Sequence, residues 1–386
     1  MPSVAVVWLL GVSQIVGYGT LYYSFAILAG GAAASLHWPA SWLFGAFSLG
    51  SLLGGLAAPE VGRRLDRHSA GAVMTLGSVV AALALLVAGL APNGLVFAGA
   101  IVVMQICGTL VLYDAAFTAL VQATGPDARK RITQLTLIAG FASTIFWPLT
   151  SWLTTLLDWR SIYLAFALAN LVVCAPIHAL IARRPRPAPP PAAGSSGTPA
   201  AAPDPWLMWL VTLGFALSGF ALSGVLAQMV PLLGALGLGA SALVVSALFG
   251  PAQFLIRFGT LLAGRNSHPI VPALVSLAAL PVSIALLALG TPALAAGMLF
   301  IVLFGFGSGL KSIVQGSLPL ALFGSAAYGA RLGVMASARQ ILASLAPFAL
   351  AYAVEAVGAR PALWLVAAVG VLGLLCLVET ARRIAR

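Results

Sequence analysis

Long uninterrupted runs of apolar residues, rather than an alternation of apolar and polar positions, dominate this sequence. Each run is long enough for a helix of about 20 residues, which crosses a hydrocarbon core of about 30 Å. The pattern therefore predicts an all-α polytopic membrane protein. The runs predict twelve transmembrane helices, with ends loose by several residues: 4–28, 39–58, 72–90, 95–120, 133–157, 161–181, 206–234, 241–263, 269–289, 294–318, 332–356 and 361–380.

Composition agrees with this pattern and argues against a soluble globule. Hydrophobic residues make up 61% of the 386 positions and charged residues 7%, with a mean hydropathy of +1.07. The first apolar run lacks the basic segment of a signal peptide, so we interpret it as a retained helix. The cysteines are scattered within spans, which predicts no disulfide, metal site or cofactor.

The net charge of +11 reports topology rather than nucleic-acid binding. If both termini are cytoplasmic, almost all Lys and Arg residues outside the spans fall on the cytoplasmic side, and only Arg160 and Arg360 fall on the other. This is the positive-inside asymmetry, and it also favours contact with anionic lipid headgroups. We expect a bacterial inner-membrane protein with both termini cytoplasmic and with no nucleic-acid partner.

One segment interrupts the apolar pattern and divides the spans into two sets of six. Residues 183–205, RRPRPAPPPAAGSSGTPAAAPDP, are rich in proline and almost free of large apolar side chains, which predicts an extended cytoplasmic linker. We expect an N-terminal six-helix bundle over 1–182 and a C-terminal one over 206–386. Equal halves indicate a duplicated bundle with a substrate site near the bilayer midplane between them.

Charge is concentrated between the second and third spans, in PEVGRRLDRHSAG (59–71). This stretch resembles the G-x-x-x-D-R-x-G-R-[RK] pattern of the major facilitator superfamily: Gly62, Asp66 and Arg67 match its first half, whereas Ser69 replaces its second glycine. DWRSIYLAF, before the sixth span, resembles the G-W-R junction of the same superfamily. The resemblance implies two pseudo-symmetric six-helix bundles and transport by alternating access.

The same resemblance implies a cytoplasmic gate. In the family the aspartate braces the contact between the halves, and we carry that role to Asp66 and Arg67 alone. The alternative is that Asp66 merely neutralises nearby arginines. Gly62 is expected to allow the chain to reverse in this short loop.

Asp114, in VLYDAAFTAL, is the one acid well inside a predicted span. A charge in the membrane costs at least ~2.5–3.5 kcal/mol on insertion scales, so an acid at this depth indicates a functional or structural role. Asp114 lies ~12 Å from the cytoplasmic end of its span at 1.5 Å per residue. It is either a proton-exchange site or a static or gating pair with Arg129, Arg131 or Lys311.

Three cations also fall within spans, and Lys311 is the nearest to the midplane. Gln315 follows Lys311 by one turn, as Arg257 follows Gln253, so the two pairs predict a polar stripe facing a cavity. Such a stripe favours an anionic, carboxylate-type substrate. Arg257 and Arg339 lie close enough to the cytoplasm to snorkel, and we expect a gating or structural role for both.

In the first span, GYGTLYYSF places Tyr18 and Tyr22 one turn apart beside glycines that let the helix bend. They are candidates for lining the substrate path, with packing as the alternative.

The sequence contains no catalytic or nucleotide-binding constellation, so we expect no enzyme. The function that fits is secondary active transport of a small organic solute, coupled to protons through Asp114, by a monomer in the lipid bilayer. The alternative is a multidrug or toxicant efflux antiporter. More remote alternatives are a membrane sensor without transport and a lipid-modifying enzyme.

Overall fold

The architecture is that of a computed structural model, which describes residues 3–184, 205–239, 241–262 and 268–385. Within these ranges the regular structure is helical throughout. The chain forms two compact units: unit 1 comprises Met1–Arg186 and Ser325–Ser337, and unit 2 comprises Pro187–Gly324 and Ala338–Arg386. Most of the predicted linker lies outside the described residues.

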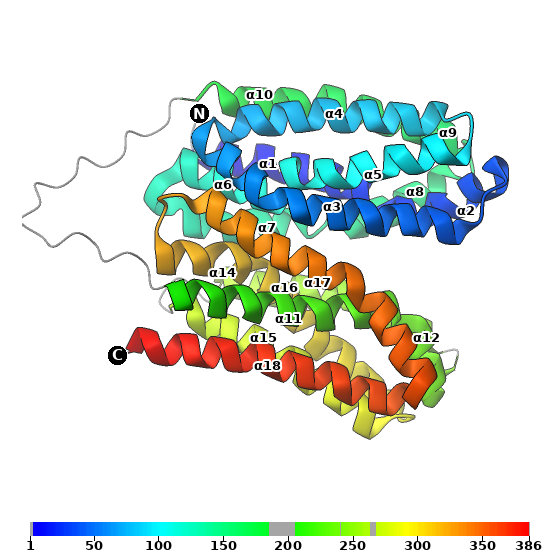
Figure 1. Ribbon diagram of the computed structural model, residues 1–386, viewed down its shortest axis with the longest axis vertical. Helices are drawn as coiled ribbons and strands as arrows, with labels where there is room; N and C mark the ends of the chain where they lie inside the picture. The colour runs from blue at the N-terminus through cyan, green and yellow to red at the C-terminus, as the bar shows by residue number, and fades with distance from the viewer. Residues whose placement is uncertain (1–2, 185–204, 240, 263–267, 386) are drawn as a thin grey trace, which may run out of the picture. The chain divides into compact units, whose positions relative to one another are not determined.

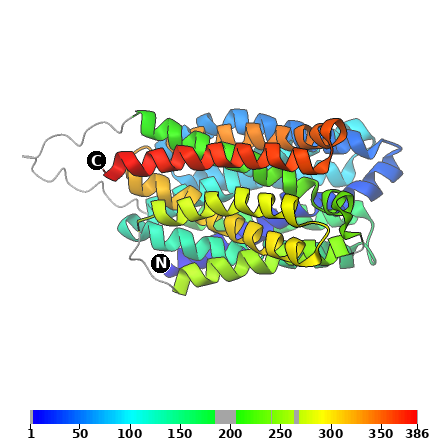
Figure 2. The ribbon, with the colours of Figure 1, turned by 90° about the horizontal axis from the view of Figure 1, so that it is seen from below.

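Unit 1 is a bundle whose helices lie roughly along one direction (Figures 1 and 2). A 3-10 turn, η2 (Gly125–Asp127), and two π-helical segments, η1 (Gly19–Tyr23) and η3 (Asn170–Cys174), interrupt its longer helices. Its α-helices are α1 (Ser3–Tyr18), α2 (Phe25–Leu36), α3 (Ala40–Arg67), α4 (Ala70–Leu90), α5 (Gly94–Val111), α6 (Tyr113–Thr124), α7 (Ala128–Ala139), α8 (Ala142–Leu153), α9 (Trp159–Ala169) and α10 (Ala175–Ala182).

Unit 2 is a second helical bundle with its own apolar core, which includes Leu280, Phe300 and Phe304. The elements of unit 2 are α11 (Pro205–Ala227), α12 (Met229–Leu233), the π-helical η4 (Gly234–Leu238), α13 (Ser241–Ala247), α14 (Phe249–Leu262), α15 (Ile270–Gly290), α16 (Leu294–Phe323), α17 (Tyr328–Val357) and α18 (Ala359–Ala385). Of these, α17 is divided: its first part, up to Ser337, belongs to unit 1, and the rest, from Ala338, belongs to unit 2.

The helices reproduce the predicted spans. By length and hydropathy, the described residues contain 11 segments able to cross a membrane. One of them, Gly94–Leu153, is 60 residues long and covers two predicted spans. The chain reverses inside it at η2, where Gly125 adopts φ 52°, a conformation that favours glycine (Figure 1).

The π-helical segments η1 and η3 meet inside unit 1 through a buried hydrogen bond. Asn170 Nδ2 donates to Thr20 Oγ1 at 2.8 Å and also to the carbonyl oxygen of Phe166 at 2.9 Å. Asn170 is 1% exposed and Thr20 is fully buried. A satisfied buried amide between two helices in a membrane protein fixes their register, because the alternative is an unpaired polar group in hydrocarbon.

Arg160 and Arg360 occupy equivalent places in the two units. Arg160 donates to the carbonyl oxygen of Ala91 at 2.6 Å, just after α4. Arg360 donates to the carbonyl oxygen of Thr291 at 2.6 Å, just after α15. Both bonds span 69 residues and satisfy a carbonyl at a helix C-terminus. The repeated spacing supports the predicted duplication of the chain.

Candidate functional site

Asp66, in the last turn of α3, binds the start of α17. Its Oδ1 accepts a hydrogen bond from the backbone N–H of Gly329 at 2.8 Å, and its Oδ2 accepts one from the N–H of Ala330 at 2.7 Å. Because α17 begins at Tyr328, both amides belong to the first turn and have no acceptor within the helix. The carboxylate also lies at the positive end of the helix dipole. Asp66 is therefore a capping residue supplied by another helix.

The arginines near Asp66 have a different carboxylate. Glu60 accepts from Arg63 at 2.7 Å and from Arg64 at 3.0 Å, and all three side chains are exposed. Arg67 is exposed as well. Local charge neutralisation therefore falls to Glu60, while both oxygens of Asp66 bind backbone amides. Whether the Asp66 contact opens during transport stays a prediction.

The expectation that Gly62 reverses the chain is wrong. Helix α3 continues from Ala40 to Arg67, and the turn follows at residues 68–69. Gly62 is helical, and a Cβ there would collide with the carbonyl oxygen of Gly329. In the same way, a Cβ on Gly333 would collide with the carbonyl oxygen of Ala58. Glycine at 62 thus serves close approach of α3 to the start of α17, which is what brings Asp66 within reach of the amides.

Asp114 lies in the first turn of α6, just after a break between α5 and α6. Leu112 adopts φ −86° and ψ −160° there, so the carbonyl of Val111 has no intrahelical partner. Gln14, which is fully buried on α1, donates to this carbonyl oxygen at 2.7 Å. The break positions Asp114 where the N-terminal end of a helix stabilises negative charge.

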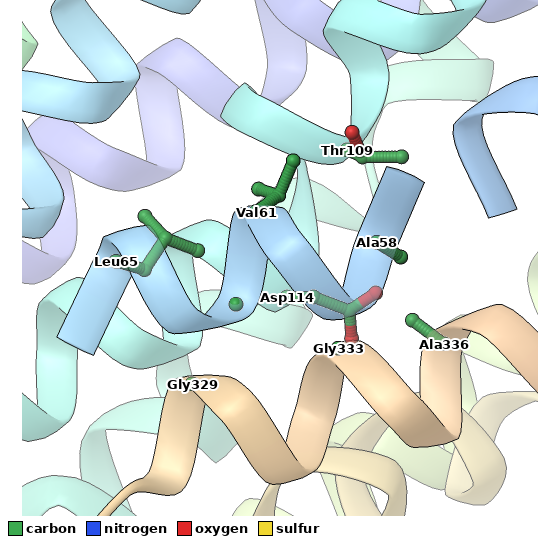
Figure 3. A pocket seen from close by; sticks show the side chains of 9 residues that line it. Ala58, Val61, Leu65, Thr109, Asp114, Gly329, Gly333 and Ala336 are labelled. Carbon is green, nitrogen blue, oxygen red and sulfur yellow. The ribbon is translucent and has the colours of Figure 1, made fainter. Parts of the chain in front are cut away.

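The carboxyl group of Asp114 lies beside α3 and the first part of α17, as Figure 3 shows. Of the partners predicted for it, Arg131 forms an ion pair with Asp127 at 4.0 Å and a hydrogen bond to Gln134 at 2.9 Å. A small crevice in unit 1 is lined by Ala58, Val61, Gly62, Leu65, Thr109, Asp114, Gly329, Gly333 and Ala336. The side chains that line it are apolar apart from those of Asp114 and Thr109.

The two candidate tyrosines belong to a larger aromatic cluster. Tyr18 lies 6.1 Å from Tyr23, measured between ring centroids, and 4.9 Å from Tyr113. Tyr22 lies 5.4 Å from Tyr23. The contact between residues 18 and 23 follows from η1, because a π-helix brings positions five apart onto one side. Tyr22 is 47% exposed, whereas Tyr18 is half-buried, so the two rings have different surroundings.

Lys311, on α16 in unit 2, is 4% exposed. Its ammonium packs against α11: a Cβ built on Gly219 would lie 3.2 Å from Lys311 Nζ and 3.1 Å from Arg339 Cγ. Among the described residues no hydrogen bond or ion pair of Lys311 is found. The carboxylates that the structure describes in unit 2 are far from Lys311 in the sequence. Glu355 is in the last turn of α17, and Glu379, toward the end of α18, binds Arg383 at 2.9 Å. Unit 2 therefore holds a buried cation beside a second cation.

The predicted polar stripe divides between two helix contacts. Arg257 donates to Gln253 Oε1 at 3.0 Å and toward the carbonyl oxygen of Gly309, and Gln253 donates to Ser308 Oγ at 3.1 Å. Arg257 is only 7% exposed, so the expectation that it snorkels is wrong. The guanidinium is therefore held by an amide of its own helix, α14, and by a carbonyl oxygen of α16. Gln315 is half-buried on α16, and Arg339 is half-buried on α17.

Sequence reasoning missed several polar side chains of unit 1. Gln105 donates to the carbonyl oxygen of Leu21, in η1, at 2.8 Å. His178 is 1% exposed and lies between the hydroxyls of Ser13 and Ser78, at 3.0 and 2.8 Å. Amides and imidazoles within apolar runs were the available signal, because burial in a membrane protein demands a partner for each.

These observations narrow the class of protein to a helical membrane protein with charged groups held inside its bundles. Among the described residues no set of three or more His, Cys, Asp or Glu side chains is grouped as metal ligands would be. The family model of the Major Facilitator Superfamily matches residues 7–347. The chain belongs to the Major Facilitator Superfamily.

Solved structures of this superfamily share the fold. The human organic anion transporter MFSD10 (TETRAN) aligns with a TM-score of 0.76 at 16% identity, covering 98% of this chain and 100% of that one. The E. coli fucose:proton symporter FucP aligns with a TM-score of 0.68 at 14% identity, covering 98% of this chain and 99% of that one. A structure of FucP in the outward conformation aligns with a TM-score of 0.69 at 14% identity, covering 97% of this chain and 98% of that one. No match was found among curated proteins.

Membership of the Major Facilitator Superfamily confirms the predicted fold class and makes the chain a secondary transporter rather than an enzyme. At identities of 14–16% the structural matches establish the fold alone. Substrate and coupling must be argued from the residues of this chain.

Proposed function

We propose that this chain is a proton-coupled transporter of small organic anions of the carboxylate type, working by alternating access. Its setting would be a bacterial inner membrane, with both termini cytoplasmic and the monomer as the working unit. Lys311 would hold the anionic group of the substrate, Asp114 would carry the proton, and the contact of Asp66 with α17 would close the cytoplasmic side. The six-helix halves 1–182 and 206–386 would be the two moving bundles.

The observation that carries the substrate class is the burial of Lys311. Removing an ammonium from water costs several kcal/mol unless a partner compensates for it. No ion pair or hydrogen bond of Lys311 is found among the described residues, and unit 2 places a second cation, Arg339, beside it. An anionic ligand is the partner that would offset this cost. A cationic ligand would raise it.

The surroundings of Asp114 support its role as the proton carrier. It is the acid that the sequence places well inside a span, and it lies in a largely apolar crevice. An acid inside a membrane protein is costly to keep and is commonly part of a proton pathway, so its position supports this role.

The aromatic cluster favours a second function. Exposed tyrosine faces attract cations and lipophilic ring systems. Tyr22, Tyr23 and Trp147 form a connected set, with ring centroids 5.4 and 5.8 Å apart. On this observation the alternative is an efflux antiporter for lipophilic or cationic toxicants, for which Lys311 would be a packing residue.

A thermal-shift measurement on the purified chain separates the two functions. The probes are matched sets of similar shape, such as benzoate with benzamide and benzamidinium, and succinate with succinamide. Each is tested on the wild type, on Lys311→Met, which keeps the volume and removes the charge, and on Lys311→Arg, which keeps the charge.

We expect a carboxylate to raise the unfolding midpoint of the wild type and to lose most of that effect in Lys311→Met. The neutral and cationic partners should have no effect that depends on Lys311. Stabilisation by the cation or the amide alone, equal in wild type and Lys311→Met, would replace the proposal by the efflux function.

A further inference from the structure

Gly219 is a buried residue in the middle of α11, and it lies beside two cations of unit 2, Lys311 on α16 and Arg339 on α17. Its backbone is in the ordinary helical region, so no positive φ requires a glycine. In a helix interior glycine is about 1 kcal/mol less favourable than alanine. The reason for glycine must therefore be the space that a side chain would fill.

That space is taken by Lys311. A Cβ at position 219 would stand 3.2 Å from the Lys311 ammonium nitrogen and 3.1 Å from Arg339 Cγ, closer than most Cβ contacts in proteins, so these neighbours would have to move slightly. Both are atoms of flexible side chains, so a methyl group would move the side chains rather than the helices. The first consequence of filling the space is that the ammonium shifts by a few tenths of an ångström.

We infer that Gly219 is a positioning residue of the anion site: the absence of its side chain sets where the Lys311 ammonium lies, and so sets the affinity for the carboxylate. This inference rests on the proposed function of Lys311. Gly219 itself need not touch the substrate, because its effect passes through the ammonium.

The size of the effect follows from the geometry of charge-assisted hydrogen bonds, which form at about 2.7–2.9 Å and weaken steeply beyond that. A misplacement of 1 Å at a binding or catalytic group costs up to about 100-fold. For a shift of a few tenths of an ångström we expect Gly219→Ala to weaken carboxylate binding roughly tenfold. Binding of the matched amide should not change.

Two other glycines of α11 provide matched controls. A Cβ on Gly214 would lie 3.1 Å from the carbonyl oxygen of Gly373, and one on Gly224 would lie 3.2 Å from that of Ala346. These contacts are as tight as those at Gly219 but meet backbone atoms, which yield less. If alanine acted only by loosening α11, Gly214→Ala and Gly224→Ala would weaken carboxylate binding at least as much as Gly219→Ala.

The deciding experiment is a double-mutant cycle with benzoate and succinate as probes, and with the full chain in detergent. Apparent dissociation constants are taken from the ligand-dependent unfolding midpoint for wild type, Gly219→Ala, Lys311→Met and the double variant. We expect Gly219→Ala to weaken binding in the wild-type background and to have no further effect in the Lys311→Met background, since coupled residues are not additive.

Three results would overturn the inference while leaving the proposed function intact: no effect of Gly219→Ala, an equal effect in both backgrounds, or an equal effect of the two control glycines. Undiminished carboxylate binding by Lys311→Met, or no carboxylate binding by the wild type, would overturn the proposed function itself. If Gly219→Ala lowers the unfolding midpoint without ligand, recovery in the double variant would assign the clash to the ammonium. If the midpoint does not recover, the clash is with atoms other than the ammonium, and the inference is wrong.

Discussion

The capping of α17 by Asp66 makes a quantitative prediction. Replacing Asp66 by Asn keeps the shape of the side chain but leaves one acceptor oxygen, and its amide group would face an N–H donor. Hydrogen bonds to charged groups contribute about 1.5–3 kcal/mol each, and the helix dipole adds about 0.3–1 kcal/mol for a charge in the first turn. Because Asp66 is half-buried rather than fully buried, we take the lower part of this range, about 2 kcal/mol.

Hydrogen exchange of the full chain, followed by mass spectrometry, measures this loss directly. Peptides that cover residues 325–337 report the Gly329 and Ala330 amides, whose protection depends on local opening. A loss of about 2 kcal/mol corresponds to exchange roughly 30-fold faster, at 1.4 kcal/mol per factor of ten. Arg67→Ala is the matched control, because Arg67 is the exposed neighbour of Asp66. Unchanged exchange in Asp66→Asn, or an equal rise in Arg67→Ala, would refute the capping argument.

Three further variants test the roles of Asp114, Asn170 and Asp158. Asp114→Asn should abolish transport driven by a pH gradient while counterflow exchange continues, and loss of both would indicate a structural ion pair. Asn170→Ala removes the buried bond to Thr20 and should destabilise the fold by about 1–3 kcal/mol in denaturant or thermal unfolding; a change near zero would contradict the link between the π-helical segments. Hydrogen bonds from Ser161 lower the pKa of Asp158, the N-cap of α9. The cap therefore stabilises the fold fully at pH values above the ordinary carboxyl pKa, and this stabilisation is lost as the pH falls through the lowered pKa of Asp158. Asp158→Ala should cost roughly 0.5–1 kcal/mol at neutral pH and nothing in strong acid, and a cost that is independent of pH would contradict this.

Span positions could be read from the sequence because membrane insertion depends on the length and hydropathy of local runs. Each predicted span has a counterpart among the described helices, including the two that share the segment Gly94–Leu153. A bend beside Tyr18 in the first span was expected from its glycines, but the π-helical form of that break could not be predicted. The π-helical η1, which brings Tyr18 to Tyr23, depends on partners from other helices such as Gln105, whose amide binds the carbonyl of Leu21.

Residue types at the candidate site were predicted better than their contacts. Asp66 stood out as an acid among arginines, but its partners are backbone amides 263 and 264 residues away, which no local pattern encodes. Gly62 was assigned to a turn because the short loop expected between the second and third spans must reverse the chain. Its close approach to α17 is a tertiary contact. Arg257 and Lys311 each have a glutamine one turn away in the sequence, but packing separates the guanidinium bound by Gln253 from the ammonium beside Gly219.

The central claim, proton-coupled movement of an anion held by Lys311, is tested most directly by the lumenal pH of proteoliposomes. Purified chain is reconstituted with a trapped pH-sensitive dye, and a gradient of benzoate, succinate or the matched amides is applied. We expect a carboxylate gradient to change the lumenal pH beyond the change in protein-free liposomes, and we expect both Lys311→Met and Asp114→Asn to abolish this excess. An excess that persists in Lys311→Met, or that arises from the amides and not the carboxylates, would contradict it.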